Sequence, residues 1–324
     1  MKANFKLVPF QSIVPALTTS TPTPGPKPTP GPTPTPRPTP GPKPTPTPKP
    51  APSADASCAS TTLPGPLKTY PDATTTGVPA GTSLTSVNGD YHTQSNGEVV
   101  SQRDVSGTLF VDHDDVKIKC THIGEMVEVN GGNTGMQMWL STVGNPTGAG
   151  GPAGVRNSDF TLRRVEILGT TDGMRIYGNV DVQDSYIHDL YSKPSSSQSS
   201  GWTHNDGAQI SGGDNTTIKH NTFDCWSFRE GQSAGVNLNK TNGDGYMTSC
   251  FMIVPGSEKV TAVIDDNIIR GRASKYLHIN SNAKVQVTNN KFGRENRDYP
   301  NLCSCSSSAT WSGNTFLDNG EAAE

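Results

Sequence analysis

The spacing of its apolar residues constrains the fold of this chain more than any other feature. Eight apolar residues, which we call anchors, are each followed five positions later by a second apolar residue, and the residue directly after each anchor is polar. The anchors are Val100, Ile118, Leu162, Val182, Ile218, Ile264, Val287 and Trp311, and their partners are Val105, Ile123, Ile167, Ile187, Phe223, Ile269, Phe292 and Phe316. Such alternation indicates short strands with one buried face.

The distances between successive anchors indicate a solenoid. They are 18, 44, 20, 36, 46, 23 and 24 residues, so four lie near 20, and the other three are near twice that or carry a long loop. One short strand every ~20 residues is typical of a coil that stacks on its neighbours. The stripes of period 3.6 that helical repeats require do not occur.

A second alternating segment precedes several anchors and reads "GMRIYGN", "GAQISGGD", "GVNLN" or "YLHINSN". Asparagine stands three residues after each of the last four anchors, at Asn221, Asn267, Asn290 and Asn314. Asparagine tolerates the left-handed conformation that a sharp corner needs. Stacked asparagine side chains can instead form hydrogen bonds from coil to coil. Both interpretations stay open.

Proline occupies every even position from Pro22 to Pro52, which excludes helix and sheet there. Such a stretch should form an extended polyproline II segment of roughly 95 Å, at about 3.1 Å per residue. Glycine does not recur at every third residue, so a collagen triple helix is excluded. We therefore expect an N-terminal anchor or docking peptide over residues 1–20, a Pro/Thr-rich stalk over 21–56 and a solenoid domain over 57–324.

The N-terminal segment "MKANFKLVPFQSIVPALTTS" is similar to a signal peptide only in its lysines and its small final residues. Polar residues and prolines interrupt the apolar run that a signal peptide needs. We therefore expect this segment to be retained as a docking peptide, with a cleaved signal as the alternative. No stretch of the sequence is long enough and apolar enough to cross a membrane.

The charge and the cysteine content limit which partners the protein could bind and which compartment it could occupy. Residues 53–324 carry 20 basic and 29 acidic side chains, a net charge of −9, which argues against nucleic-acid binding. Six cysteines in a loop-rich chain suit an oxidising, extracellular setting, although their pairing has fifteen solutions. Buried free thiols are the alternative. The cysteines and histidines lack zinc-site spacing.

The repeat resembles the right-handed parallel β-helix of pectate lyases, polygalacturonases and phage tailspikes. The segment "TTTGVPAGTSLT" after the proline-rich stretch further resembles β-helix domains of actinobacterial secreted proteins and of minor tail proteins of their phages. The resemblance covers about residues 70–320. It implies an all-β, right-handed parallel β-helix but no single activity, because this fold carries lyases, hydrolases and adhesins.

The catalytic motifs of the enzymes in this group do not recur in the chain. Polygalacturonase-like sites show Asn-Thr-Asp, Asp-Asp, His-Gly and Arg-Ile-Lys in order, whereas this sequence contains Asp-Asp pairs but neither His-Gly nor Arg-Ile-Lys. Pectate lyases use an arginine base and a calcium cluster, but Arg175, Arg270 and Arg272 lack a recognisable signature around them. Binding is therefore favoured over catalysis, and the question of an enzyme stays open.

Two Asp-Gly dipeptides mark the candidate site. "TDGMRI" contains Asp172 and "THNDGAQI" contains His204, Asn205 and Asp206, and both precede equivalent alternating segments. We expect them to line one exposed edge of the solenoid, where one or two coils would separate the two carboxylates by ~5 to 10 Å, a range that glycosidases use. With Asn205 they could also hold Ca²⁺. His204 could act as a general base. The alternative is that Asp-Gly is only a turn.

Two loops, residues 130–154 and 192–203, are expected to interrupt the repeat, and each contains one tryptophan, Trp139 or Trp202. An exposed indole can stack on a sugar ring, and the alternative is that each tryptophan covers an edge of the core. The candidate ligand-binding residues are thus Trp139, Trp202, Asn205 and Asp206, and the candidate catalytic residues are Asp172, His204 and Asp206.

The function expected from these observations is that of a spike, fibre or decoration protein on the virion of an actinobacterial phage. It would display a glycan-contacting β-helix on a stalk, bind a host cell-surface polysaccharide and join the virion through residues 1–20. The sequence leaves assembly as a homotrimer open. The alternative is a secreted polysaccharide lyase or glycoside hydrolase with a Pro/Thr linker.

Overall fold

A computed structural model of the chain describes residues 58–148, 150–198, 201–229 and 247–323. The expected docking peptide and stalk, residues 1–20 and 21–56, lie outside the described residues. The described part is all-β, with thirty strands. It contains no helix of the length and hydropathy that crossing a bilayer requires.

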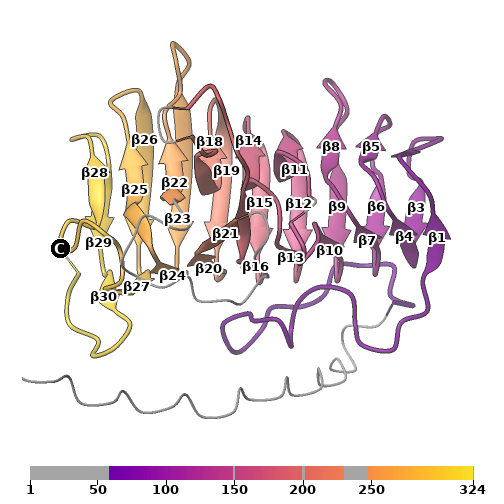
Figure 1. The fold of residues 1–324 in the computed structure, drawn as a ribbon, viewed down its shortest axis with the longest axis horizontal. Helices are drawn as coiled ribbons and strands as arrows, with labels where there is room; N and C mark the ends of the chain where they lie inside the picture. The colour runs from indigo at the N-terminus through magenta and orange to yellow at the C-terminus, as the bar shows by residue number, and fades with distance from the viewer. Residues whose placement is uncertain (1–57, 149, 199–200, 230–246, 324) are drawn as a thin grey trace, which may run out of the picture. The chain divides into compact units, whose positions relative to one another are not determined.

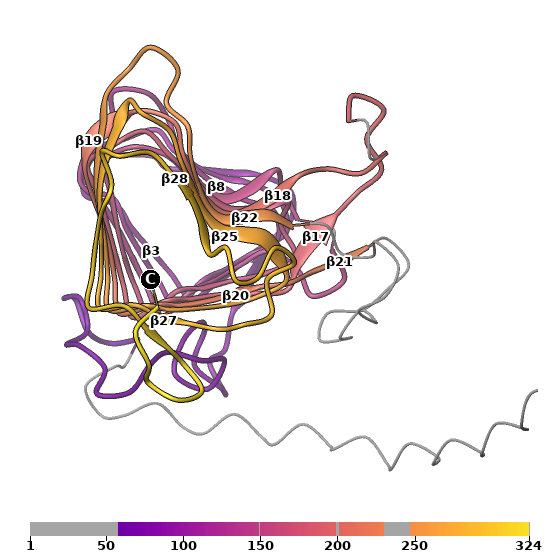
Figure 2. The same ribbon diagram turned by 90° about the vertical axis from the view of Figure 1, so that its left-hand side faces the viewer.

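Three parallel sheets, A, B and C, receive one strand in turn from each coil of the chain, and the coils stack side by side (Figure 1). Figure 2 shows the resulting three-sided cross-section. This arrangement is a parallel β-helix, as the repeat predicts. A small fourth sheet joins β17 (Leu190–Ser192) to β21 (Ser227–Arg229) at one corner.

Within each of the three sheets, neighbouring strands follow one another in the order of the chain. Sheet A comprises β1 (Thr85–Val87), β4 (Arg103–Val105), β7 (His122–Ile123), β10 (Thr142–Val143), β13 (Glu166–Ile167), β16 (Tyr186–Ile187), β20 (Thr222–Cys225), β24 (Ile268–Gly271), β27 (Lys291–Phe292) and β30 (Thr315–Phe316). Sheet B comprises β2 (Tyr91–His92), β5 (Leu109–Val111), β8 (Val127–Val129), β11 (Ala153–Asn157), β14 (Asp172–Ile176), β18 (Asn205–Ile210), β22 (Met247–Ile253), β25 (Ala273–Ile279) and β28 (Cys303–Cys305). Sheet C comprises β3 (Val99–Ser101), β6 (Lys117–Lys119), β9 (Met136–Trp139), β12 (Phe160–Arg163), β15 (Val180–Gln183), β19 (Gly213–Lys219), β23 (Val260–Asp265), β26 (Ala283–Thr288) and β29 (Thr310–Ser312).

The eight anchors all lie in sheet C, and their partners five residues later all lie in sheet A. The register places Val182 opposite Leu162 on one side and Ile218 on the other. Ile118, Val182, Ile218 and Val287 are fully buried in one continuous core. The predicted inward direction of the offset pairs is therefore confirmed, and only the pair in the last coil, at Trp311 and Phe316, is partly buried.

One coil departs from the pattern in the sequence. The sequence predicts a loop over residues 130–154, but these residues contain β9 and β10, with Met138 in the anchor position and Val143 five residues later. The residue after this anchor is Trp139, which breaks the rule that this position is polar. "GVNLN" lies outside the described residues, and the strand that follows β18 in sheet B is β22.

The corner between sheets C and A repeats with one backbone conformation. The residue two positions after each anchor has a left-handed φ between 46° and 67° in all nine coils: Gln102, Cys120, Leu140, Arg164, Asp184, His220, Asp266, Asn289 and Gly313. Eight of these nine residues are not glycine, although this conformation disfavours most side chains. Packing against the neighbouring coils imposes it.

The interpretation of Asn221, Asn267, Asn290 and Asn314 as left-handed corner residues is wrong, because the left-handed residue is the one before each of them. These asparagines form the ladder instead. Each side-chain oxygen accepts a hydrogen bond from the backbone N of the equivalent residue in the preceding coil, at 2.9–3.0 Å. All four are buried, so the ladder satisfies backbone groups that would otherwise lack a partner.

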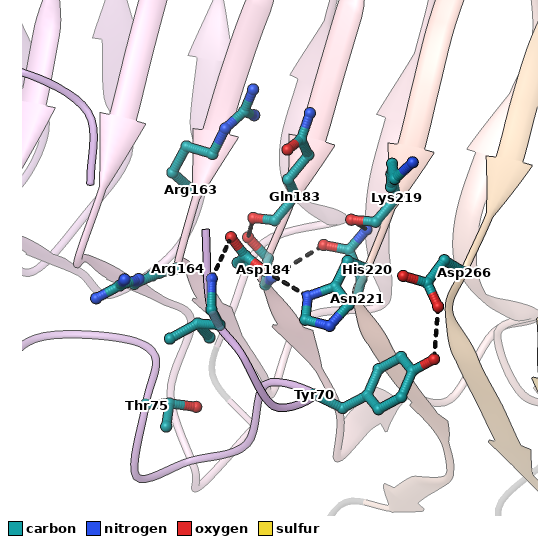
Figure 3. Close-up of polar contacts among 12 residues, drawn as sticks. Tyr70, Thr75, Arg163, Arg164, Gln183, Asp184, Lys219, His220, Asn221 and Asp266 are labelled. Atoms are coloured by element: carbon teal, nitrogen blue, oxygen red, sulfur yellow. Dashed lines mark hydrogen bonds and ion pairs between the residues drawn. The ribbon is translucent and has the colours of Figure 1, made fainter. Parts of the chain in front are cut away.

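A segment that we call the strap, residues 58–82, lies along these left-handed corners (Figure 3). Gly65 O accepts a hydrogen bond from Arg164, and Leu67 N donates one to Asp184 Oδ2 at 3.1 Å. The Tyr70 hydroxyl donates to Asp266 Oδ1 at 2.6 Å. Cys58 forms a disulfide with Cys120, itself a left-handed corner residue. The corner side chains therefore hold the strap.

The six cysteines form three disulfides, Cys58–Cys120, Cys225–Cys250 and Cys303–Cys305, so the alternative of free thiols does not apply. The first joins the strap to the second of the stacked coils. The second joins β20 of sheet A to β22 of sheet B within the core.

Candidate functional site: a pocket over two stacked carboxylates

The two Asp-Gly segments lie side by side at the start of neighbouring strands in sheet B. Met174 pairs with Ala208 and Ile176 with Ile210, so Asp172 and Asp206 occupy equivalent positions in adjacent coils. This is the placement that the sequence predicts. Neighbouring strands of a sheet are about 4.8 Å apart, which brings the two carboxylates close together.

The Asp-Gly dipeptides are not turns, since both lie within strands. A Cβ atom on Gly173 would stand 2.2 Å from Gly207 O, and one on Gly207 would stand 2.7 Å from Cys250 O. Glycine is therefore required because the backbones of successive coils approach closely here. The aspartate before each glycine is consequently fixed at an equivalent position of its coil.

Both carboxylates are buried, which corrects the expectation of an exposed edge: Asp172 is 2% and Asp206 5% exposed. Asp172 Oδ1 accepts a hydrogen bond from the backbone N of Asp206 at 3.0 Å. Asp206 Oδ1 in turn accepts bonds from Ser249 N at 3.0 Å and from Ser249 Oγ at 2.8 Å. One oxygen of each carboxylate thus has a structural role.

The second oxygens differ in their partners. Asp172 Oδ2 forms an ion pair with Arg175 Nε at 2.7 Å. Asp206 Oδ2 has no hydrogen-bond partner among the described residues. The hydroxyls of Thr171 and Thr248 beside them also lack a partner in the described part of the chain. Several polar atoms with unused hydrogen-bonding capacity therefore gather at this corner.

The residues that carry these atoms line a pocket of about 500 Å³ on the outside of sheet B. Its charged and amide groups come from Asp172, Arg175, His204, Asp206 and Gln209. The other lining residues are Thr171, Ser195, Ser197, Gln198, Thr203, Thr248, Met252 and Val254. The loop between β17 and β18 supplies one wall, and the strands β14, β18 and β22 supply the floor.

The lateral extension formed by β17, β21 and the loop after β17 explains the burial of the pair, and it projects from one corner of the cross-section in Figure 2. Asn205 fixes it to the coil. Its Nδ2 donates to Thr171 O and Tyr191 O at 2.6 and 2.8 Å, and its Oδ1 accepts from Ser192 and Thr203. Since its amide group is fully engaged, Asn205 positions the site and has no capacity left for a ligand.

Trp202 and His204 lie at the loop end of the site. Trp202 is half-buried, and the Arg229 guanidinium lies over its ring at 4.3 Å. His204 is exposed and lines the pocket. Trp202 stands immediately before the lining residues Thr203 and His204, so it supports the wall rather than forming part of the lining.

Trp139 does not belong to this pocket. It is fully buried in a small cluster with Cys120 and Leu140, covered by Cys58 and Leu63 of the strap. It therefore offers no exposed ring to a sugar. Its burial agrees with the alternative, that this tryptophan covers an edge of the core. The strap also explains why an apolar residue stands at a position that is polar in the other coils.

The carboxylates share a strongly perturbed electrostatic environment. Burial and the neighbouring charge of Asp172 raise the pKa of Asp206 to about 7, although Ser249 opposes the shift. Burial also raises the pKa of Asp172, against the opposing effect of Arg175. Two close carboxylates resist double ionisation, so the pair retains a proton at a higher pH than an isolated aspartate does.

The sequence predicts the pair and His204 but not the Arg175–Asp172 ion pair or the contribution of Gln209. Arg175 and Gln209 face each other across the register, two residues after the glycines. Because both residues occupy the same outward position on equivalent strands, the sequence pattern could have identified Arg175 and Gln209 as site residues. Thr248 carries no such signal, because it occupies the irregular register between β18 and β22.

No three His, Cys, Asp or Glu side chains gather in a metal-binding arrangement within the described ranges. The corner supplies two carboxylates, of which one is paired with Arg175, and Asn205 is already satisfied. Ca²⁺ binding therefore remains a prediction from the sequence alone.

A second hollow, of about 590 Å³, lies over sheet C and is lined by threonines with Lys284, Gln286, Asn215 and apolar residues. It contains no carboxylate and no histidine. Of these two hollows, only the one over sheet B is lined by carboxylates and a histidine.

Comparison with protein-family models, with curated proteins and with solved structures found no match to this chain. The fold is therefore assigned from the stacked parallel coils alone.

Proposed function

We propose that the pocket over Asp172 and Asp206 binds a carbohydrate. The observation that supports this most is that Asp206, whose Oδ2 has no hydrogen-bond partner among the described residues, lines one hollow together with Thr171, Thr248 and other polar residues. Sugar hydroxyls both donate and accept hydrogen bonds, and such a ligand satisfies carboxylate, hydroxyl and guanidinium groups together. Arg175 and Gln209 add charge-assisted and amide contacts.

We further propose that the protein is a right-handed β-helix carried on the virion of an actinobacterial phage, with residues 21–56 as stalk and 1–20 as docking peptide. The Pro/Thr-rich composition of residues 21–56 supports an extended stalk between the docking peptide and the β-helix. The glycan would then be a polysaccharide of the host surface. Mass spectrometry of purified virions and of culture supernatant tests this location, and recovery only from supernatant, with a chain beginning near Thr18, contradicts it.

Binding is favoured over cleavage because of where the two carboxylates stand. Acid–base cleavage requires a proton donor and a base on opposed sides of one bond. Asp172 and Asp206 lie near the start of adjacent strands of the same sheet, and each uses one oxygen to accept a backbone N–H. The two groups therefore approach a ligand from the same side.

One observation favours a second function, cleavage of a polysaccharide by a secreted enzyme. Environments that shift the pKa values of two neighbouring carboxyl groups are a recurring feature of acid–base catalysts. The pKa of Asp206, raised to about 7, would let this group donate a proton near neutral pH.

A glycan array that includes cell-wall polysaccharides extracted from actinobacteria tests the proposal. We expect the wild-type protein to bind, and Asp206→Asn and Arg175→Gln to lose at least tenfold in affinity, since each removes a charged hydrogen-bonding group. Thr261→Ala, at the hollow over sheet C, is the matched control and should bind like wild type. Absence of binding to every glycan, or unchanged affinity in both site variants with folding intact, contradicts the proposal. Release of new reducing or unsaturated ends by wild type, abolished in Asp206→Asn, favours the enzyme.

A further inference from the structure

Two exposed apolar side chains lie at the far ends of the strands that carry the pocket. Tyr177 is 51% exposed and Val254 41%, and only three other large hydrophobic residues among the described ones are comparably exposed. Tyr177 follows β14 and Val254 follows β22. Because Ile176, Ile210 and Ile253 are in register, Tyr177, Ser211 and Val254 stand at the same position in three successive coils.

The surface between these two residues is free of a protruding side chain because Gly212 lies there. A Cβ atom on Gly212 would lie 2.2 Å from Glu258 Oε2 and 3.6 Å from the Tyr177 ring. Gly212 thus lies where the ring and the carboxylate approach each other, and a side chain there would fill the space between them. Glu258 belongs to the loop between β22 and β23, which stands above its neighbours in Figure 1.

This patch, defined by Tyr177, Ser211, Val254 and Glu258, is continuous with the pocket. Val254 belongs to both, and Gln209 and Met252 of the pocket floor stand two residues before Ser211 and Val254. Along β14 the distance from Asp172 to Tyr177 is about 17 Å at 3.3–3.4 Å per residue, which is longer than a single sugar ring.

We infer that Tyr177 is a second carbohydrate contact, on which a sugar ring of the same glycan chain stacks while the pocket over Asp206 holds another. This inference rests on the proposed function of the pocket. The ligand would then be an oligosaccharide of several units that follows the direction of β14, β18 and β22. The phenol ring offers an apolar face, and Glu258 and Ser211 offer hydrogen bonds to the hydroxyls at the ring edge.

The surroundings of Tyr177 favour a sugar over a protein partner. An exposed apolar patch commonly marks a protein contact. Here, however, a carboxylate and a hydroxyl border the ring, and the patch continues into a pocket whose lining is mostly polar. That combination of one aromatic face with polar groups around it suits a ligand that is apolar on its faces and polar at its rim.

Fragments of defined length, prepared from the polysaccharide that the wild type binds best on the array, test this inference by isothermal titration calorimetry. We expect Tyr177→Ala to weaken binding of the longest fragment by about tenfold, the worth of one aromatic stacking contact, and to leave the shortest fragment that binds unaffected. Tyr177→Phe should bind like wild type, because stacking needs the ring and not the hydroxyl.

Tyr299→Ala is the matched control, since Tyr299 is 42% exposed and lies beside Arg294 and Phe316, several coils from Tyr177. Equal affinity of Tyr177→Ala and wild type for every fragment overturns the inference. An equal loss of affinity for fragments of every length also overturns the inference, because it would mean that Tyr177 supports the structure of the pocket itself. A change in sedimentation equilibrium of Tyr177→Ala, without any change in glycan binding, would instead identify a protein contact. Asp206→Asn separates the two proposals, because it weakens all fragments if the pocket binds sugar and none if it does not.

Discussion

Asn267 donates a hydrogen bond from Nδ2 to Oδ1 of Asn290 in the next coil at 2.9 Å, and Asn290 Oδ1 also accepts the backbone N–H of Asn267 at 3.0 Å. The amide of Asn267 further donates to Ile218 O and Asp265 O. One buried side chain therefore joins three coils, and its removal leaves several buried backbone groups without a partner.

Replacing Asn267 with alanine should consequently lower the free energy of unfolding by about 3 kcal/mol, the cost of one to three unsatisfied buried groups. Urea unfolding monitored by circular dichroism measures this. Asn301→Ala, at an exposed position, should change stability by less than about 0.5 kcal/mol. Equal effects of the two substitutions would mean that the ladder contributes nothing specific.

The anchors support a second prediction. Ile218 is fully buried in the core, and the next residue toward the N-terminus, Thr217, faces outward on the same strand. Ile218→Asp should prevent stable folding, since it buries an unpaired charge. Thr217→Asp should leave the protein folded. Protease resistance of the two variants distinguishes them, and survival of Ile218→Asp would show that the anchor does not face the core.

The repeat is predictable from sequence because burial imposes it: each coil must place one apolar residue inside sheet C and another inside sheet A. The coil around Met138 departs from the pattern for a physical reason. Its outward residue, Trp139, is apolar because the strap covers it, and a strap more than 50 residues earlier in the chain leaves no local pattern.

The corner asparagines differ from the sequence prediction for a similar reason. Left-handed corners usually select glycine or asparagine, yet here Cys120, Leu140, Arg164 and His220 adopt that conformation because the stacked coils impose it. Residue propensity alone would place asparagine at the left-handed corner. The ladder, however, requires the asparagine amide at the position directly after the corner.

At the candidate site the sequence predicts the juxtaposition of Asp172 and Asp206, which depends only on register. It does not predict their burial, which depends on the lateral extension built by β17, β21 and the loop between β17 and β18. Insertions between coils follow no periodicity, so their path over the surface cannot be read from spacing.

The Cys58–Cys120 disulfide closes a loop across a sequence separation of 62 residues. In the chain-entropy model such a cross-link stabilises the folded state by about 4 kcal/mol. We therefore expect Cys58→Ser to lower the melting temperature and to increase hydrogen exchange over residues 60–82 more than in the last coils, because the strap loses its covalent tether. Uniform exchange across the whole domain would show that the strap is held by its hydrogen bonds alone.

A charged cluster on the outside of sheet A predicts how stability changes at alkaline pH. Burial alone would lower the pKa of His188, but hydrogen bonds to Asp189 and Glu166, at 2.9 and 3.4 Å, outweigh it and raise the pKa to about 9. The ring also stacks on Tyr186 at 4.0 Å, and the Asp224–Arg270 ion pair lies on the neighbouring strands.

Because the folded-state pKa exceeds the unfolded value of 6.5, the stabilisation by His188 is complete below pH 6.5 and is lost as the pH rises to about 9. The loss should be of the order of 3 kcal/mol. Urea unfolding at pH 6, 7.5 and 9 measures it. In His188→Gln this pH dependence should disappear, and an unchanged slope in that variant would assign the effect to another group.

Asp206 should act in a different pH window. Burial beside Asp172 raises its pKa from 3.8 to about 7, so the folded state holds the proton more tightly than the unfolded chain does. The contribution of Asp206 to stability should therefore fall as the pH rises from about 4 to about 7 and stay constant above, with a loss of about 4 kcal/mol. Asparagine at this position cannot ionise, and its Oδ1 can still accept the hydrogen bond from Ser249 N.

The variant Asp206→Asn should consequently be about as stable as wild type at pH 4 and more stable at pH 8, while it loses affinity for the glycan. Urea unfolding at four pH values between 4 and 8 measures the first expectation, and the glycan array measures the second. Such a gain in stability with a loss of binding is typical of a residue kept for function rather than for folding. If Asp206→Asn is instead destabilised equally at both pH values, the carboxylate is ionised in the folded state without cost, and the corner serves only to join the coils.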